Sequence, residues 1–272
     1  MSEPLVQRLK ATITVENKVG AGGIIATEYV AKAPPDGHTL LFSSSLHYTL
    51  PWISEAPVHF DAVKDFTPVA RFLTAPLILL VPANSPHKTL MDLVREMKSR
   101  PGQLAYSSAG TGSITHMCPL LLNHMTGTTA HHIPYKGAAG AVTDAAGGQV
   151  GFTCQSASVA MGLVKAGRLR ALAVTGAQRM DALPEVPTVA QAGVAGYDLS
   201  TFLGVFVRSG TPGPIVQRLS EDLVQIAATP QFKEFCVANS LSLSIANADT
   251  FRAEVPTEVE RWKRMAELTK KG

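Results

Sequence analysis

Charged and aromatic residues are scarce in this chain, at 17% and 6% of its 272 residues. The net charge is only +3, and lysines and arginines are scattered along the sequence instead of gathered in clusters. A nucleic-acid-binding protein needs a basic face, so we expect no nucleic acid among the partners. Because 46% of the residues are hydrophobic, the low charge indicates a globular chain and excludes a disordered one.

Long apolar segments are also missing. The longest apolar run, residues 73–81, contains Pro76 and is far shorter than the ~20 residues that a transmembrane helix needs. The N-terminal residues 1–10 have no apolar stretch after their charges, so the sequence as given shows no secretory signal. We therefore predict no membrane-spanning segment in this sequence.

Cysteine is rare and irregularly spaced. The three cysteines, Cys118, Cys154 and Cys236, include no C-x-x-C pair, and their number is odd. This pattern suggests neither a zinc site nor a complete disulfide framework. We predict three buried thiols.

Catalytic and cofactor motifs are missing as well. The serines at 107 and 108 are outside any G-x-S-x-G motif, and the histidines lack the H-E-x-x-H spacing of a zinc site. The sequence has no P-loop, and Thr115 stands where a dinucleotide-binding turn would have its third glycine. Lys136 could form a Schiff base, but it fits equally well as a cation at a strand end. We expect no catalytic residue, no metal ligand and no cofactor.

The most informative segment is 104–125, which has the pattern of a strand, a turn of small residues at 108–113 and a helix. Its helical spacing is set by apolar residues at Ile114, Met117, Leu121 and Met125. Glycines let a backbone approach a ligand closely, and the first turn of a helix offers unpaired N–H donors. Such a turn binds anions, particularly carboxylate or phosphate. The alternative is a glycine turn that only packs the helix on a sheet.

The rest of the chain alternates β-rich runs with helical periods, followed by an amphipathic C-terminal region. We predict strands at 13–15, 38–43, 68–72, 77–81, 130–134, 150–154, 169–174 and 203–207, and helices at 1–10, 24–32, 89–98, 138–146 and 159–165. This order predicts an α/β fold with a parallel sheet covered on both faces. The runs 77–81 and 203–207, each closed by a Pro-rich stop, could form a hinge.

Six segments of the chain resemble one protein family. They are VENKVGAGGIIATEYVAKAPPDGHTLLF, KDFTPVARFLTAPLILLVPANSP, PGQLAYSSAGTGSITHM, HHIPYKGAAGAVTDAAGGQV, KAGRLRALAVTGAQRMDALPEVPTVAQAG and VRSGTPGPIVQRL. They resemble the Bug-type receptors, which are the TctC-like extracytoplasmic solute-binding proteins of tripartite tricarboxylate transporters. The resemblance follows the order of the chain and covers nearly all of it.

The resemblance implies a type II periplasmic-binding-protein fold, with two α/β lobes joined by two crossing strands. Lobe 1 would comprise residues 1–75 and 201–272, and lobe 2 residues 76–200. It also implies a non-catalytic periplasmic receptor, monomeric when complete, that holds a small carboxylate between the lobes. A dicarboxylate, a tricarboxylate or an acidic amino acid would fit, for delivery to the membrane components of a transporter or to a sensor.

Carried over by motif, the ligand-binding residues fall in four turns. They are Ser108, Ala109, Gly110, Thr111, Gly112 and Ser113 with Thr115 and His116; Lys136, Gly137 and Ala138; Gln155 and Ser156; and, in the other lobe, Ser44 and Ser45. The third turn is usually rich in Asp or Asn in this family, so Gln155 would change the ligand group that is read. Pro119 is also a departure, tolerable only if regular helical bonding starts near it.

The family pattern begins earlier than this sequence. The resemblance implies a signal peptide and a first strand upstream, and we expect the full-length form to carry both. Without that strand, the edge at 13–15 would lack its neighbour, and the chain would bind carboxylates weakly and associate through unpaired backbone.

One alternative to a receptor remains at this point. A hydrolase or transferase acting on a carboxylate or phosphate ester could use the turn at 108–113 as an oxyanion site.

Overall fold

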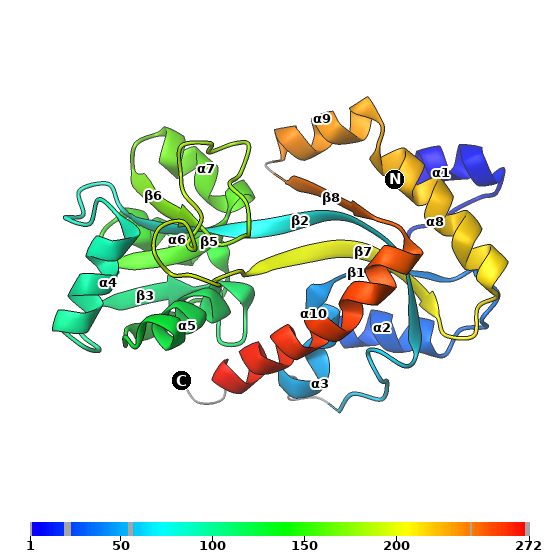
Figure 1. The fold of residues 1–272 in the computed structure, drawn as a ribbon, viewed down its shortest axis with the longest axis horizontal. Coiled ribbons are helices and arrows are strands. Elements are labelled where there is room, and N and C mark those ends of the chain that lie inside the picture. Colours follow the sequence, from blue (N-terminus) through cyan, green and yellow to red (C-terminus); the bar gives the residue numbers. More distant parts are fainter. Residues whose placement is uncertain (1, 19–22, 54–56, 240, 270–272) are drawn as a thin grey trace. The chain divides into compact units, whose positions relative to one another are not determined.

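The computed structural model describes residues 2–18, 23–53, 57–239 and 241–269. The chain divides into two compact units, which are treated separately below. Unit 1 contains Met1–Thr74, Thr201–Ala238 and Leu243–Ala266, and unit 2 is built mainly on Ala75–Ser200. The chain passes from unit 1 into unit 2 within one long strand, β2 (Phe66–Pro82), and returns at the start of β7 (Ser200–Arg208). Figure 1 labels most elements of both units.

Unit 1 combines a small antiparallel sheet with most of the longer helices. Its other elements are α1 (Ser2–Leu9), α2 (Ile24–Ala31), β1 (Leu40–Ser44), the 3-10 helix η2 (Ser45–Tyr48), α3 (Leu50–Ile53), α8 (Gly213–Ala227), α9 (Pro230–Ala238), β8 (Ser242–Ala246) and α10 (Ala248–Thr269). Strand β1 pairs antiparallel with β7, which lies next to β2. Aromatic side chains fill the core, with Phe206, Phe251 and Trp262 almost completely buried.

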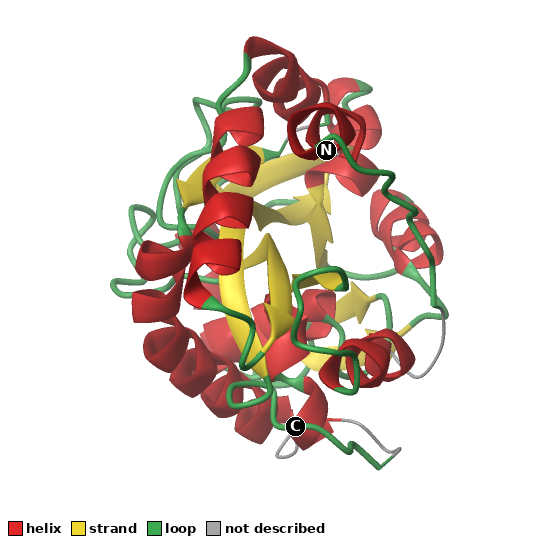
Figure 2. Ribbon diagram, turned by 90° about the vertical axis from the view of Figure 1, so that its right-hand side faces the viewer, coloured by secondary structure: helices red, strands yellow, loops and turns green. Residues whose placement is uncertain are grey.

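Unit 2 alternates strands and helices along the chain. Figure 2 colours the helices red and the strands yellow. Its elements are the second part of β2, α4 (Leu90–Ser99), β3 (Ala105–Ser108), α5 (Ile114–Thr126), β4 (His131–Pro134), α6 (Ala138–Ala146), β5 (Phe152–Ser156), α7 (Ala157–Lys165) and β6 (Leu169–Val174). Strand β3 pairs in parallel with both β4 and β5, whereas β2 runs antiparallel to β5 and β6. The expectation of a parallel sheet is therefore correct for β5, β3 and β4 only.

Helix α6 shows how the sequence fixes the packing of unit 2. Its buried face consists of Ala141, Val142 and Ala145, which are small enough to bring the helix close to the sheet. This closeness allows the Ser107 hydroxyl of β3 to donate a hydrogen bond of 2.8 Å to the Ala141 carbonyl. A side chain larger than alanine at 141 or 145 would push the helix away from β3.

Two strand predictions are wrong. Residues 13–15 form no strand, and Val15 is 69% exposed, so its β-branched side chain has nothing to pack against. The runs 68–72 and 77–81 are one continuous strand, β2, which includes Pro76. Proline is compatible with extended backbone and removes only one donor, so it does not have to interrupt a strand.

The buried face of α5 differs from the one that apolar spacing predicts. Thr115, His116, Cys118 and Leu122 are buried, whereas Met125 is exposed. Polar side chains occupy buried positions here because they hydrogen-bond to the preceding turn. Pro119 is the sixth residue of the helix, so it lies inside the regular bonding pattern and removes the N–H that would reach the Thr115 carbonyl.

The prediction of three buried thiols is wrong for two of them. Cys118 of α5 and Cys154 of β5 form a disulfide, with Cα atoms 6.4 Å apart. Cys236 is a free, buried thiol. Spacing alone could not pair the two cysteines, because their proximity depends on α5 packing against β5.

Reduction of this disulfide should destabilise the protein. Closing a loop of 36 residues restricts the unfolded chain, which corresponds to about 3–4 kcal/mol of unfolding free energy in the chain-entropy model. We expect a reductant to lower the urea midpoint of the native protein and of Cys236→Ala. The double variant Cys118→Ala/Cys154→Ala should not respond, and an unresponsive native protein would contradict the assignment.

Candidate functional site

Three helix N-termini meet at one edge of the unit 2 sheet. Strands β4, β3 and β5 are adjacent and parallel, so their carboxyl ends lie at the same edge. Each is followed directly by a helix, α6 after β4, α5 after β3 and α7 after β5. First-turn N–H groups and the helix dipoles therefore point toward a common region, which favours an anion.

The caps of these helices differ. Ser113 caps α5, because its Oγ accepts a hydrogen bond of 3.3 Å from the His116 N–H. The residues at the corresponding positions of α6 and α7, Gly137 and Ser156, make no side-chain cap bond. The Ser156 hydroxyl instead lies 3.0 Å from the Ser158 hydroxyl. Helices α6 and α7 thus keep first-turn donors that no capping side chain occupies.

The turn at 108–113 requires glycine at two positions. Gly110 and Gly112 have φ values of 125° and 76°, a region that residues with a Cβ rarely adopt. A Cβ at 110 would also lie 3.3 Å from the Tyr135 carbonyl oxygen, whereas position 112 is open. The requirement for glycine at position 112 therefore comes from the backbone conformation alone.

Three N–H groups of this turn already have acceptors, in the turn itself or at the start of α5. The Ala109 N–H donates to Thr115 Oγ1 at 2.8 Å, the Gly110 N–H to Ser108 Oγ at 3.1 Å and the Gly112 N–H to His116 Nδ1 at 3.2 Å. These bonds hold the loop in shape without a ligand. A carboxylate would compete for the donors as a stronger, charged acceptor.

Two histidines stack beside the turn. The rings of His116 and His132 have centroids 3.9 Å apart, and the Tyr106 ring stacks against His132 at 5.0 Å. His132 Nε2 lies 2.7 Å from Ser108 Oγ. The sequence-based site omitted His132, although the register of β4 on β3, which pairs it with Tyr106, brings it to this position.

Both histidines are kept neutral by burial. Burial and, to a smaller extent, the neighbouring His132 lower the pKa of His116 to about 4. The pKa of His132 is lowered by burial and by His131. Because His116 Nδ1 accepts from the Gly112 N–H, its proton is on Nε2. The histidines therefore act as hydrogen-bonding groups, and the exposed Lys136 is the nearby fixed cation.

The remaining predicted residues lie in β5 and in unit 1. Gln155 is fully buried in β5, its Nε2 donates to Thr153 Oγ1 at 2.8 Å, and its Oε1 has no partner among the described residues. Ser44 ends β1 and Ser45 begins η2, so both belong to unit 1 and the structure does not relate them to the turn. The Ser45 hydroxyl is buried without a partner in the described chain.

A sheet edge that gathers helix N-termini is the place where open α/β proteins bind their ligands. Residues 1–270 match the family described as "Tripartite tricarboxylate transporter family receptor", so the chain belongs to that family. This confirms the resemblance to TctC-like receptors. The chain is a solute-binding receptor, and nothing supports the alternative of a hydrolase or transferase.

Individual relatives agree with this assignment. The chain is 30% identical over 263 residues to protein BugT of Bordetella pertussis, covering 96% of this chain and 81% of BugT. The structure of Rpa4515 from R. palustris with adipate has a TM-score of 0.80 at 29% identity, covering 98% and 90% of the two chains. MatC from Rhodopseudomonas palustris with bound malate has a TM-score of 0.74 at 26% identity, covering 97% and 91%. The predicted two-lobe α/β fold class is thereby confirmed.

Protonation of His116 should destabilise the protein. Since its pKa is about 4 when folded and near 6.5 when unfolded, the unfolded chain binds the proton first as pH falls. The contribution of neutral His116 to the free energy of unfolding is fully present above pH 6.5. We expect it to decline by ~2 kcal/mol between pH 6.5 and 4. Urea unfolding at pH 7, 5.5 and 4.5 measures this decline.

The matched variant is His116→Asn, which keeps an acceptor near the Nδ1 position but does not titrate. Its stability should fall less with decreasing pH than that of the native protein. The remaining decline would include buried His47 of unit 1, whose pKa burial also lowers to about 4. Identical pH dependence in the two proteins would contradict the role of His116.

Proposed function

We propose that this receptor binds a small dicarboxylate, tricarboxylate or acidic amino acid at the sheet edge of unit 2. The observation that carries the proposal is the convergence of the N-termini of α5, α6 and α7, of which two lack side-chain caps. Lys136 adds a fixed positive charge at the end of β4. The relatives described above hold adipate and malate, which supports a carboxylate as the ligand class.

The proposed ligand-binding residues are those expected from the sequence, with His132 added. Residues 108–113, Thr115 and His116 would receive one carboxylate, while Lys136, Gly137 and Ala138 supply charge and backbone donors from the α6 side. Gln155 and Ser156 would contact the remainder of the solute, and Ser44 and Ser45 would contribute from lobe 1. This assignment retains the proposed lobe boundaries of 1–75 with 201–272, and 76–200.

The proposed site of action is the periplasm. The Cys118–Cys154 disulfide supports this location, because disulfides persist in oxidising compartments. In the described part of the chain, every helix is too short or too polar to span a bilayer. The membrane components of a tripartite tricarboxylate transporter are the expected recipients of the solute. A sensor protein as partner and a monomeric state belong to the same proposal.

A ligand screen tests the proposed class. Thermal unfolding of the full-length protein with succinate, malate, adipate, citrate and glutamate should show stabilisation by at least one of them. Binding to the native state raises stability as RT ln(1 + [L]/Kd), so the shift should grow with ligand concentration. Uncharged diamides of the same acids serve as controls. No shift with any of the acids would refute the proposal.

Substitutions in the turn test the site. Gly112→Val should abolish carboxylate binding, because valine cannot adopt the φ of 76° that aligns the turn. Gly148→Val is the matched control, since Gly148 has a φ of 77°, is exposed and follows α6 at its other end. Both variants should lose stability, but only the first should lose binding in isothermal titration. Equal affinities in the two variants would show that the turn is purely structural.

Ser108→Ala tests the contribution of one side chain. The Ser108 hydroxyl accepts from the Gly110 N–H and lies beside His132, so its removal loosens the turn on two sides. We expect a loss of ~1–2 kcal/mol in binding free energy, measured by titration with the best ligand of the screen. If Ser108→Ala binds the ligand with unchanged affinity, the Ser108 side chain does not contribute and only the backbone groups of the turn bind the carboxylate.

A further inference from the structure

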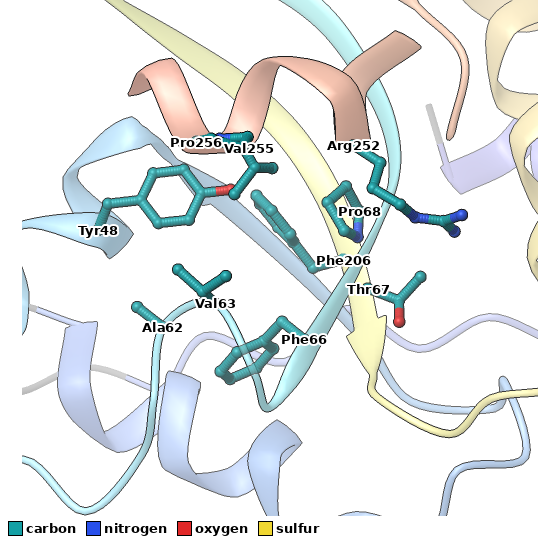
Figure 3. Close-up of a pocket in the computed structure, with 10 residues that line it drawn as sticks. All are labelled: Tyr48, Ala62, Val63, Phe66, Thr67, Pro68, Phe206, Arg252, Val255 and Pro256. Carbon is teal, nitrogen blue, oxygen red and sulfur yellow. The ribbon is translucent and has the colours of Figure 1, made fainter. Parts of the chain in front are cut away.

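Unit 1 contains a half-open pocket whose lining residues are separate from the proposed carboxylate site of unit 2. Its volume is about 300 Å³, and it lies between α10, the loop before β2, and strands β2 and β7 (Figure 3). The buried walls are apolar and include Phe66, Phe206 and Val255, while Val63 and Arg252 lie at the exposed rim. A volume of this size is at the lower end of the range of small-molecule sites.

The hydroxyl of Tyr48 is the unusual feature of this pocket. Tyr48 is only 1% exposed, yet its hydroxyl makes no hydrogen bond to any described residue. Figure 3 shows it directed toward the apolar side chain of Val255. Burial raises the pKa of Tyr48 above its ordinary value, with a further contribution from Glu258, so the phenol keeps its proton. The hydroxyl borders the pocket, so a ligand oxygen placed there would give this donor an acceptor.

The charges around the pocket determine how a ligand would be oriented. The charge of Glu258 contributes to the raised pKa of Tyr48. Glu258 itself accepts hydrogen bonds from Arg261 at 2.6 Å and from Trp262 Nε1 at 3.1 Å. Its negative charge disfavours a carboxylate beside the Tyr48 hydroxyl, so a neutral oxygen is preferred there. Arg252 at the rim is 57% exposed, and its only recorded ion pair within the described chain, to Asp249, is long at 3.9 Å.

We propose that this pocket is a second binding site, for a small aromatic monocarboxylate that carries a neutral acceptor oxygen opposite its carboxylate. The ring would contact Phe66, Phe206 and Val255, the neutral oxygen would accept from Tyr48, and the carboxylate would pair with Arg252. Each part of this ligand meets a matching group: apolar walls, an unpartnered donor and a weakly paired cation. A short aliphatic dicarboxylate would leave the apolar walls uncovered, so the two sites take different ligands.

Two isosteric probes test the role of the Tyr48 donor. 4-Methoxybenzoate has an acceptor oxygen where 4-ethylbenzoate has a methylene group, and both can be titrated into the whole protein by calorimetry. We expect the methoxy compound to bind about fivefold more tightly, as one additional hydrogen bond predicts. In Tyr48→Phe, which removes no side-chain hydrogen bond to the described residues, the two affinities should become equal.

Charge variants test the rim and separate the two sites. Arg252→Gln should lower the affinity for both probes about two- to fivefold, and this loss of affinity should be smaller at high salt. Lys64→Gln is the matched control, because Lys64 is an 85% exposed cation outside the pocket lining. Gly112→Val should bind both probes as the native protein does. The proposal is overturned if neither probe binds the native protein, or if Gly112→Val abolishes binding while Tyr48→Phe leaves the preference unchanged.

Discussion

Parallel pairing of β3 with β4 and β5 is the constraint on which the binding site of unit 2 depends. The register, with Ser108 opposite Pro134 and Tyr106 opposite both His132 and Phe152, brings three strand ends to one edge. Each strand is short and is followed at once by a helix, so the helix N-termini necessarily gather there. Small residues on α6 and the Cys118–Cys154 disulfide hold two of the covering helices against these strands. The proposed anion site thus depends on sheet topology more than on any single side chain.

Local patterns predicted much of this arrangement. The apolar period at 89–98 and the small-residue segment 138–146 correspond to α4 and α6, because their buried faces follow helical spacing. The glycine turn at 108–113 was found because its positive φ values demand glycine. The predictions that failed concern features that depend on contacts between distant parts of the chain. Neither the disulfide nor the continuity of β2 through Pro76 is set by neighbouring residues.

The sequence predicted the glycine turn and the helix that follows it, but not the electrostatics of the histidines beside the turn. The rings of His116 and His132 stack on each other, and burial is the largest cause that lowers the pKa values of both. Neutral imidazoles contribute directional hydrogen bonds instead of charge. The spacing of apolar residues could not predict that His116 is buried, because His116 is held in place by a hydrogen bond from the Gly112 N–H to its Nδ1. The charge for ligand attraction is then left to Lys136 and the helix dipoles.

The bonds inside the turn also limit how strongly a ligand can be held. Each N–H that a carboxylate takes from Ser108, Thr115 or His116 leaves that acceptor to find another donor or water. Binding is therefore an exchange of hydrogen bonds, and its free energy is smaller than the number of donors suggests. The uncapped first turns of α6 and α7 have no such competing side chain. Those two helices should accordingly provide more of the net affinity, while the turn at 108–113 mainly provides shape.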